Sequence, residues 1–313
     1  MRAITIDRFQ TPGSLRDLPE PALEPDAVLV RITCAGVNPV DWKTRDGKSG
    51  ERSFPLVLGQ DFAGVVERAG ERIGRVKAGQ RVFGCARDHG SYAEATLIRD
   101  GQQDSPFTAI PDGVSDEQAA ALPTPGLTAL ASLDILGVTR GTELLIVGAA
   151  GAVGGAAVQM AHHRGARVSA VVLPGQAQTA ADFGADETIE ASDDLARAVR
   201  KRHPEPFDAV FDLVSDGETL KKNVPLVKKG GKLVTTIHVA DEKWFADQGI
   251  TATNVVMYET PQSSPQGLDE LAKMVVDRAL QVEVTTEKPL AQAVSVLDDV
   301  KSGKLHGKAV LRT

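Results

Sequence analysis

The amino-acid sequence predicts an α/β protein of two domains, one rich in β-structure and one built on a doubly wound parallel sheet. Short strand-like runs bounded by Pro, Gly and Asp fill the first third of the chain, and no long amphipathic helix pattern occurs before about Ser115. After that point strands alternate with helical stretches, which is typical of βαβ units on a parallel sheet. A length of 313 residues is sufficient for two hydrophobic cores.

The first domain is predicted from β-runs such as 27–32 and 61–66. The second domain follows as a regular alternation of strands and helices. Its predicted strands are 143–147, 167–173, 187–189, 207–213, 232–238 and 250–258. Its predicted helices are 152–164, 176–183, 193–203, 218–227 and 241–248, of which the third is expected to be capped by Ser192.

The chain ends with four further predicted elements: a helix at 267–280, a strand at 281–285, a helix at 290–302 and a strand at 308–311. Because they follow the sixth strand of the parallel sheet, we expect them to return to the first domain. The expected domains are therefore 1–122 together with 263–313, and 123–262.

Composition excludes several classes of function. The net charge of −7 argues against a nucleic-acid or anionic membrane partner, since both require clustered Lys and Arg. Residues 144–161 carry no charge, but four glycines interrupt them, so we predict no membrane span. The chain shows no signal peptide at its start, and only two cysteines, Cys34 and Cys85, are present. We therefore expect a cytoplasmic protein.

The strongest chemical signal is the segment 144–155, Leu-Leu-Ile-Val-Gly-Ala-Ala-Gly-Ala-Val-Gly-Gly. A buried strand runs into a turn of small residues, and a helix begins at once. Small residues let the backbone approach a pyrophosphate, and the helix N-terminus presents N–H groups to it. The segment predicts a dinucleotide-binding domain at 123–262. The expected phosphate-binding residues are Ala150, Gly151, Ala152, Val153 and Gly154.

The sequence favours NADP(H) over NAD(H). Enzymes that use NAD(H) place an Asp or Glu about twenty residues past the turn, whereas residues 171–178 contain no acid. No Arg or Lys stands there to attract a 2′-phosphate, so Gln176, Gln178 and the N–H groups of the next helix are the available donors. NAD(H) stays open as the alternative.

No metal site is predicted. A catalytic zinc needs three protein ligands and a structural zinc needs four, whereas the two cysteines form no CxxC pair. His162 and His163 are adjacent on a predicted helix and point about 100° apart. His203 and His306 are expected at exposed ends of elements.

Several motifs resemble the medium-chain dehydrogenase/reductase superfamily, in its zinc-independent branch of quinone oxidoreductases and alkenal/enone reductases. They run in order through the chain: 35–43 (Ala-Gly-Val-Asn-Pro-Val-Asp-Trp-Lys), 59–66, 122–129, 149–154, 230–234 and 307–310. Zinc-bearing relatives have Cys at the position of Asn38 and His at that of Gln60. The Tyr that follows the Asp in several quinone reductases is absent here, where Trp42 and Lys43 stand.

This resemblance implies a GroES-like β-rich catalytic domain, a Rossmann cofactor domain, and an active site in the cleft between them. It also implies NADPH-dependent reduction of quinones or of carbon–carbon double bonds conjugated to a carbonyl. The resemblance, together with the rule that ligands bind beyond the carboxyl ends of parallel strands, predicts further cofactor-binding residues. They are Thr128, Leu173, Gln176, Leu213, Val214, Ile237, His238 and Val239. Relatives pair the last strand of this sheet, 250–258, across a two-fold axis, so a homodimer is expected.

Hydride transfer to an enone builds negative charge on the carbonyl oxygen, so a donor to that oxygen is the main contribution required of the protein. Lys43 and Asn38 are the candidate donors, and Asp41 is expected to orient Lys43. The alternatives are an exposed Lys43 paired with Asp41 or Asp46, and an Asn38 that fixes a turn. Two other functions stay open: a dedicated biosynthetic enoyl or alcohol oxidoreductase of the same fold, and a non-catalytic NADPH-binding protein.

Overall fold

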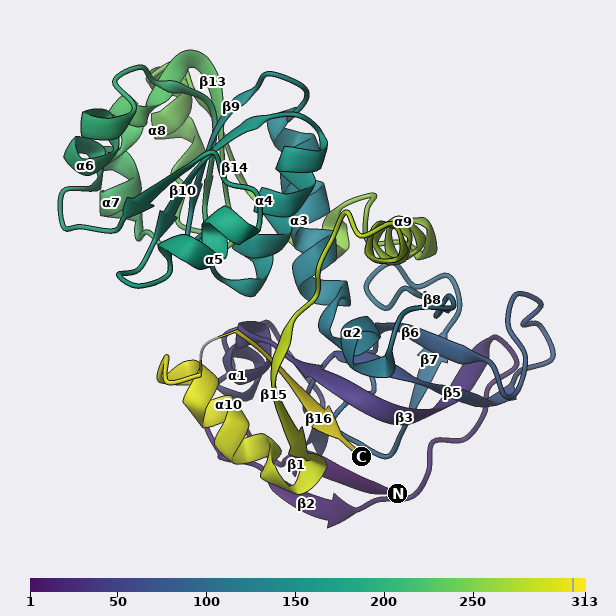
Figure 1. Ribbon diagram of the computed structural model, residues 1–313. Coiled ribbons are helices and arrows are strands. Elements are labelled where there is room, and N and C mark those ends of the chain that lie inside the picture. The colour runs from purple at the N-terminus through teal and green to yellow at the C-terminus, as the bar shows by residue number, and fades with distance from the viewer. Residues whose placement is uncertain (306) are drawn as a thin grey trace. The chain divides into compact units, whose positions relative to one another are not determined.

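The computed structural model describes residues 1–305 and 307–313, and the chain divides into two compact units (Figure 1). The first unit comprises residues 1–127, 261–277 and 282–313. The second comprises residues 128–260 and 278–281. No helix in the described part of the chain is long and apolar enough to span a bilayer.

The second unit is built on a six-stranded parallel sheet. In the sheet the strands stand in the order β11-β10-β9-β12-β13-β14, which is the 3-2-1-4-5-6 order of doubly wound dinucleotide-binding folds. Their bounds are β9 (Glu143–Val147), β10 (Arg167–Val172), β11 (Glu187–Glu190), β12 (Phe207–Asp212), β13 (Val227–Thr235) and β14 (Thr251–Asn254). The predicted Rossmann architecture is therefore confirmed.

Among the described residues, one helix precedes the first of these strands, and five helices connect the strands to one another. They are α3 (Pro123–Leu136), α4 (Ala152–His163), α5 (Ala177–Asp182), α6 (Leu195–Arg202), α7 (Gly217–Lys222) and α8 (Glu242–Asp247). One face of the sheet packs against Leu195, Leu220 and Phe245, which come from α6, α7 and α8. Figure 1 shows α4 and α5 on the other side. Both faces of the sheet are thus covered, which explains why the central strand β9 is apolar and buried from Leu144 to Val147.

Several element ends differ from the prediction. Asp194, not Ser192, caps α6, because its carboxylate accepts the backbone N–H of Arg197 at 3.0 Å. The predicted helix 218–227 ends at Lys222 and continues as a 3-10 turn at Val224–Leu226, where Pro225 supplies no N–H for an α-helical hydrogen bond. The last strand is only four residues long, since Met257–Glu259 forms another 3-10 turn.

The helix α3 was not predicted. Its residues are buried on nearly every side, with Asp134 the only fully exposed position within its bounds. A helix that is apolar all round shows no 3.6-residue periodicity to detect.

The first unit contains a seven-stranded sheet in which β15-β16-β3-β5-β6-β8 are neighbours and β7 pairs with β3. The bounds are β3 (Ala27–Val37), β5 (Asp61–Ala69), β6 (Arg81–Cys85), β7 (Ala95–Arg99), β8 (Phe107–Ala109), β15 (Val284–Pro289) and β16 (Lys308–Arg312). A second, three-stranded sheet consists of β1 (Arg2–Ile6), β2 (Ser14–Asp17) and β4 (Leu56–Val57). The predicted β-rich unit is confirmed.

The C-terminal strand joins the sheet formed by the start of the chain, because β16 pairs antiparallel with β3 from Val37 to Cys34. The helices of this unit are α1 (Pro39–Arg45), α2 (Asp116–Ala121), α9 (Pro265–Val276) and α10 (Ala293–Lys301). Leu290, Val296 and Leu297 of the tail pack into the same core as Ile4, Val30 and Phe62. The tail strand predicted at 281–285 lies at Val284–Pro289 instead.

Candidate functional site

The first unit places three candidate residues at the start of α1. Asn38 ends the extended strand β3, and Pro39 occupies the first helical position, where a missing N–H costs nothing. The Asp41 carboxylate accepts the backbone N–H of Asn38 at 2.8 Å, which closes the first turn of the helix. The short helix α1 and its N-cap therefore carry Asn38, Asp41 and Lys43.

Asn38 and Asp41 belong to a buried polar network. The Asn38 side-chain NH₂ donates to Asp61 at 2.8 Å, and its Oδ1 accepts from the Lys308 ammonium at 2.5 Å. The Tyr92 hydroxyl donates to Asp41 at 2.8 Å. All five residues are buried. The sequence assigned no role to Tyr92 or Lys308.

Burial shifts the pKa values of the ionisable groups in this network. It raises the pKa of Asp41 to about 7, against the opposing effect of the hydrogen bonds from Asn38 and Tyr92. Burial also raises the pKa of Asp61, whereas the charge of Lys308 and the hydrogen bonds from Thr124 and Asn38 oppose that shift. It lowers the pKa of Lys308, and the carboxylates of Asp61 and Asp41 act in the opposite direction.

Lys43 lies apart from that network. It is half-buried, and its pKa is lowered by burial and secondly by the charge of Lys48. Its ammonium lies 5.9 Å from the centre of the Trp42 ring, and in the described ranges it forms no ion pair. The expectation that Asp41 orients Lys43 is wrong, because residues two apart on a helix point about 200° apart.

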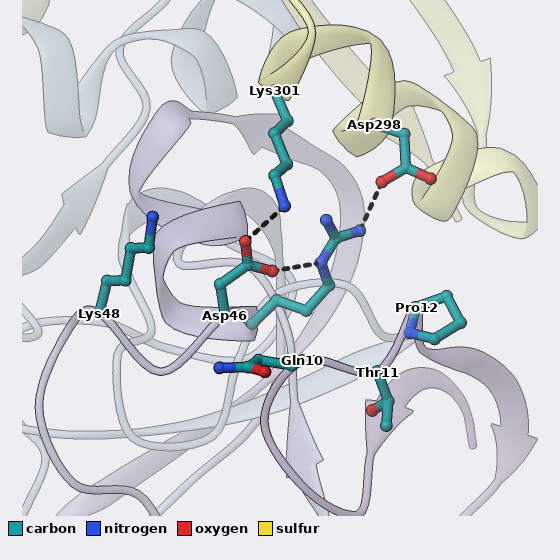
Figure 2. A pocket seen from close by; sticks show the side chains of 8 residues that line it. Gln10, Thr11, Pro12, Asp46, Lys48, Asp298 and Lys301 are labelled. Carbon is teal, nitrogen blue, oxygen red and sulfur yellow. Dashed lines mark hydrogen bonds and ion pairs between the residues drawn. The ribbon is translucent and has the colours of Figure 1, made fainter.

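Asp46 does not pair with Lys43 either. It lies in a pocket of about 390 Å³ beside the C-terminal end of α1 (Figure 2). There Asp46 binds Lys301 at 2.6 Å and Arg45 at 3.3 Å, and Arg45 binds Asp298 at 2.7 Å. In Figure 2 Lys301 and Asp298 extend from α10 toward these partners. The ion pairs attach α1 to α10, and among the described residues no carboxylate pairs with the Lys43 ammonium.

The positions at which zinc-bearing relatives have ligands are both hydrogen-bonded to other groups here. Asn38 binds Asp61, and the Gln60 amide donates to the Thr124 hydroxyl at 2.7 Å. Thr124 in turn donates to Asp61 through its hydroxyl at 2.6 Å. Across residues 1–305 and 307–313 no group of three His, Cys, Asp or Glu side chains is arranged to hold a metal ion. His306 lies outside the described residues.

In the second unit the Gly/Ala turn lies at the carboxyl end of β9. Gly148 has φ +88°, a left-handed conformation that favours glycine. A Cβ on Gly154 would lie 2.2 Å from the Gly148 carbonyl oxygen, so only glycine lets α4 pack this closely. A Cβ on Gly151 would meet nothing nearer than 3.4 Å. The backbone at Gly151 is thus open to a ligand. Ala150 precedes Gly151, and Ala152 and Val153 follow it as the first residues of α4.

The other candidate cofactor-binding residues of this unit lie mostly past the ends of parallel strands. Leu173 follows β10, Leu213 and Val214 follow β12, and Ile237, His238 and Val239 follow β13. A Cβ on Gly148 would contact Val214, so β12 ends beside the turn. His238 is exposed and has φ +58°. Thr128 is buried in α3.

In the segment after β10, the Gln176 side-chain NH₂ is a donor with no partner among the described residues. The side-chain oxygen of Gln176 accepts the Leu173 N–H at 3.3 Å, so its side-chain NH₂ is available to a ligand. The Gln178 side-chain NH₂ instead donates to Asp182 at 2.7 Å. The pairing of β11 with β10 also brings an acidic residue beside the end of β10, although the two lie far apart in the sequence. Glu190 ends β11 and is paired in register with Val172 of β10.

Two family models match the chain, one for each part of the fold. A model described as alcohol dehydrogenase GroES-like domain matches residues 24–115, and one described as zinc-binding dehydrogenase matches residues 152–277. A zinc-type alcohol dehydrogenase-like protein of Staphylococcus epidermidis is 30% identical over 78% of this chain and 74% of its own length. The chain belongs to the medium-chain dehydrogenase/reductase superfamily, in the branch that contains quinone oxidoreductases and alkenal/enone reductases.

The chain is also similar to a further relative and to two solved structures. A 2-methylene-furan-3-one reductase of Solanum lycopersicum is 34% identical over 68% of this chain, and the match spans 55% of that protein. The quinone oxidoreductase of Pseudomonas syringae has a TM-score of 0.89 at 28% identity, covering 100% of this chain and 99% of that one. A mycobacterial protein solved with NADPH has a TM-score of 0.88 at 26% identity, covering 100% of both chains.

Proposed function

We propose that this protein is an NADPH-dependent oxidoreductase that reduces quinones or α,β-unsaturated carbonyls by hydride transfer without zinc. The observation that supports it most is the open backbone at Gly151 in a sheet of 3-2-1-4-5-6 order. The tomato reductase and the Pseudomonas quinone oxidoreductase support the substrate class.

Residues 150–154 would hold the pyrophosphate, because the N–H groups at the start of α4 are not used within the helix. The dinucleotide, when bound, supplies the hydride. The Gln176 NH₂ group is the proposed donor to the 2′-phosphate, and the NADPH complex of the mycobacterial relative supports this preference. The carboxylate of Glu190 opposes it.

Lys43 is the proposed donor to the substrate oxygen. Its ammonium is half-buried and lacks a carboxylate in the described ranges, so its charge is available to a developing oxyanion. The lowered pKa also eases release of a proton to the enolate. Asn38 takes a lesser part than expected, since its Oδ1 and one of its N–H groups already have partners.

We propose that the protein does not use zinc because of the side chains at the two positions where zinc-bearing relatives have metal ligands. Asn38 and Gln60 offer amides in place of thiolate and imidazole, and both amides are hydrogen-bonded within the protein. We further propose a cytoplasmic homodimer, since both cysteines are buried as free thiols and β14 is a sheet edge.

A single assay tests the function. Consumption of NADPH and of NADH is followed against quinones, alkenals, enones and alcohols, with and without a chelator. We expect turnover of quinones or enones with NADPH that the chelator does not change. Tight NADPH binding without turnover of any acceptor would favour a non-catalytic protein, and alcohol oxidation alone would favour the alternative enzyme. A strong preference for NADH would contradict the cofactor assignment.

A further inference from the structure

Lys308 is a charged residue inside the hydrophobic core of the first unit. It begins β16, is 6% exposed, and is followed by the buried residues Ala309, Val310 and Leu311. Its ammonium donates to the Asn38 Oδ1 at 2.5 Å and to the Val37 carbonyl at 3.1 Å. A buried lysine is costly unless its charge is balanced and its N–H groups are bonded.

The ammonium fixes the orientation of the Asn38 side chain. An ammonium can only donate hydrogen bonds, so the amide oxygen of Asn38 must face Lys308. The amide NH₂ then faces Asp61, which accepts it at 2.8 Å. A cation on one side and an anion on the other therefore select one of the two amide orientations.

Asp61 extends the same network to another segment. Its carboxylate also accepts the Thr124 N–H at 3.0 Å and the Thr124 hydroxyl at 2.6 Å. The groups that face Lys308 from its neighbours are Asp61 of β5, Asp41 of α1 and the Cys85 thiol of β6. The charges of these two buried carboxylates act on the ammonium, and the Tyr92 hydroxyl donates to Asp41.

We propose that Lys308 is a positioning residue, whose buried ammonium balances Asp61 and Asp41 and thereby holds Asn38 and the first turn of α1 in place. This inference rests on the proposed function, because Lys43 follows that turn directly in α1 and an error of about 1 Å in a reacting group costs on the order of a hundredfold in rate. Lys308 acts through Asn38 and the carboxylates and does not touch the substrate.

The test compares Lys308→Met with the double variant Lys308→Met/Asp61→Asn, and with Lys304→Met as a control. Lys304 is an exposed lysine on the same stretch of chain. We expect Lys308→Met to lower kcat by on the order of tenfold or more at pH 8. The Kd for NADPH should stay unchanged, because none of the network residues belongs to the second unit.

A charge-balancing role predicts a specific pH dependence. As the pH falls from 8 to 6 the buried carboxylates of Lys308→Met take up protons, so its deficit in kcat and in unfolding temperature relative to wild type should shrink. The added Asp61→Asn substitution should restore much of both at pH 8, because it removes one unbalanced anion.

A deficit that is the same at both pH values and is not relieved by Asp61→Asn would overturn the proposal, since loss of packing alone gives that result. An unchanged kcat in Lys308→Met would overturn it too. If Lys308→Met does not fold, folding of the double variant supports the proposal and failure of both contradicts it. If the wild-type protein turns over no acceptor, the proposed function fails, while the unfolding temperatures still report whether Lys308 balances the carboxylates.

Discussion

Lys43 differs from Asp41 and Arg45, the other charged residues of α1, in having no partner for its charge in the described part of the chain. Asp41 binds Tyr92 and the Asn38 N–H, and Arg45 binds Asp46 and Asp298. Partial burial makes an unpaired ammonium unfavourable, and a transient negative charge on a substrate would relieve that cost. If the proposed function holds, the cation would therefore act on the transition state more than on the ground state.

We expect Lys43→Ala to lower kcat by about 10²–10³-fold, the usual effect of removing one donor to an oxyanion. Steady-state kinetics with an enone and NADPH measure it. Lys304→Ala is the control, since Lys304 is an exposed lysine with no proposed role in the reaction. Equal kcat values for wild type and Lys43→Ala would show that another group stabilises the oxyanion.

Asp41 makes the stability of the first unit depend on pH. Its folded-state pKa is raised to about 7 from the ordinary 3.8, so the folded state binds a proton that the unfolded state releases. The resulting stability is fully present below about pH 4 and is lost as the pH rises through about 7. Other carboxylates have lowered pKa values and act in the opposite sense, for example Asp46 beside Lys301 and Arg45.

The prediction therefore concerns the difference in unfolding free energy between Asp41→Asn and the wild-type protein. Asp41→Asn, which cannot ionise, should gain stability relative to wild type as the pH is raised from 5 to 8. Urea unfolding at both pH values measures this difference. A difference that does not change with pH would show that Asp41 is ionised throughout, balanced by the Lys308 charge.

At the scale of elements, the Gly/Ala turn combines glycines required by the fold with one required by the ligand. Gly148 needs its positive φ, and Gly154 needs close packing against the Gly148 carbonyl. Gly151 has φ −75° and ψ 171°, which any residue adopts, and its Cβ would meet no atom nearer than 3.4 Å. Glycine is one of several residues suited to its position as the N-cap of α4, and we propose that the approach of a phosphate selects glycine among them.

Gly151→Val should therefore fold normally and lose NADPH binding, because the branched side chain would occupy the space of the pyrophosphate. Fluorescence titration and thermal unfolding measure the two properties. Gly74→Val is the control, since Gly74 also has an ordinary φ and open space around it. Unchanged NADPH affinity in Gly151→Val would mean that the cofactor does not approach this turn.

Sequence patterns predicted the parallel strands, and they predicted α4 because it follows the Gly/Ala turn directly. They did not predict α3, which is buried all round, or α1, which is only seven residues long. Missing α1 had a consequence for the site, because without the helix Asp41 and Lys43 seem to be neighbours. Lys308 was missed because only the pairing of β16 with β3 brings the tail of the chain to Asn38. Tyr92 was missed because its backbone bonds to Ile4 and Leu58 bring it to Asp41 from 51 residues away in the sequence.

At the scale of the whole molecule, β14 is the element that suggests assembly. It ends the sheet order, so β13 alone pairs with it among the described strands. The Val255 N–H donates to the Thr235 carbonyl on β13, and strand N–H groups alternate in direction, so the Ala252 N–H faces the open edge. The Asn254 N–H, which faces the same way, donates to Glu242 at 3.1 Å.

If two copies pair through this edge, Ala252→Pro should convert the dimer to a monomer, because proline removes the outward N–H and leaves the hydrogen bonds to β13 intact. Sedimentation velocity at micromolar concentration measures the change, and Ala252→Val, which keeps the N–H, is the control. NADPH binding by the monomer should persist, since the turn at Gly151 lies at the end of β9, three strands from this edge. A monomeric wild type, or an Ala252→Pro variant that stays dimeric, would show that this edge does not form the interface.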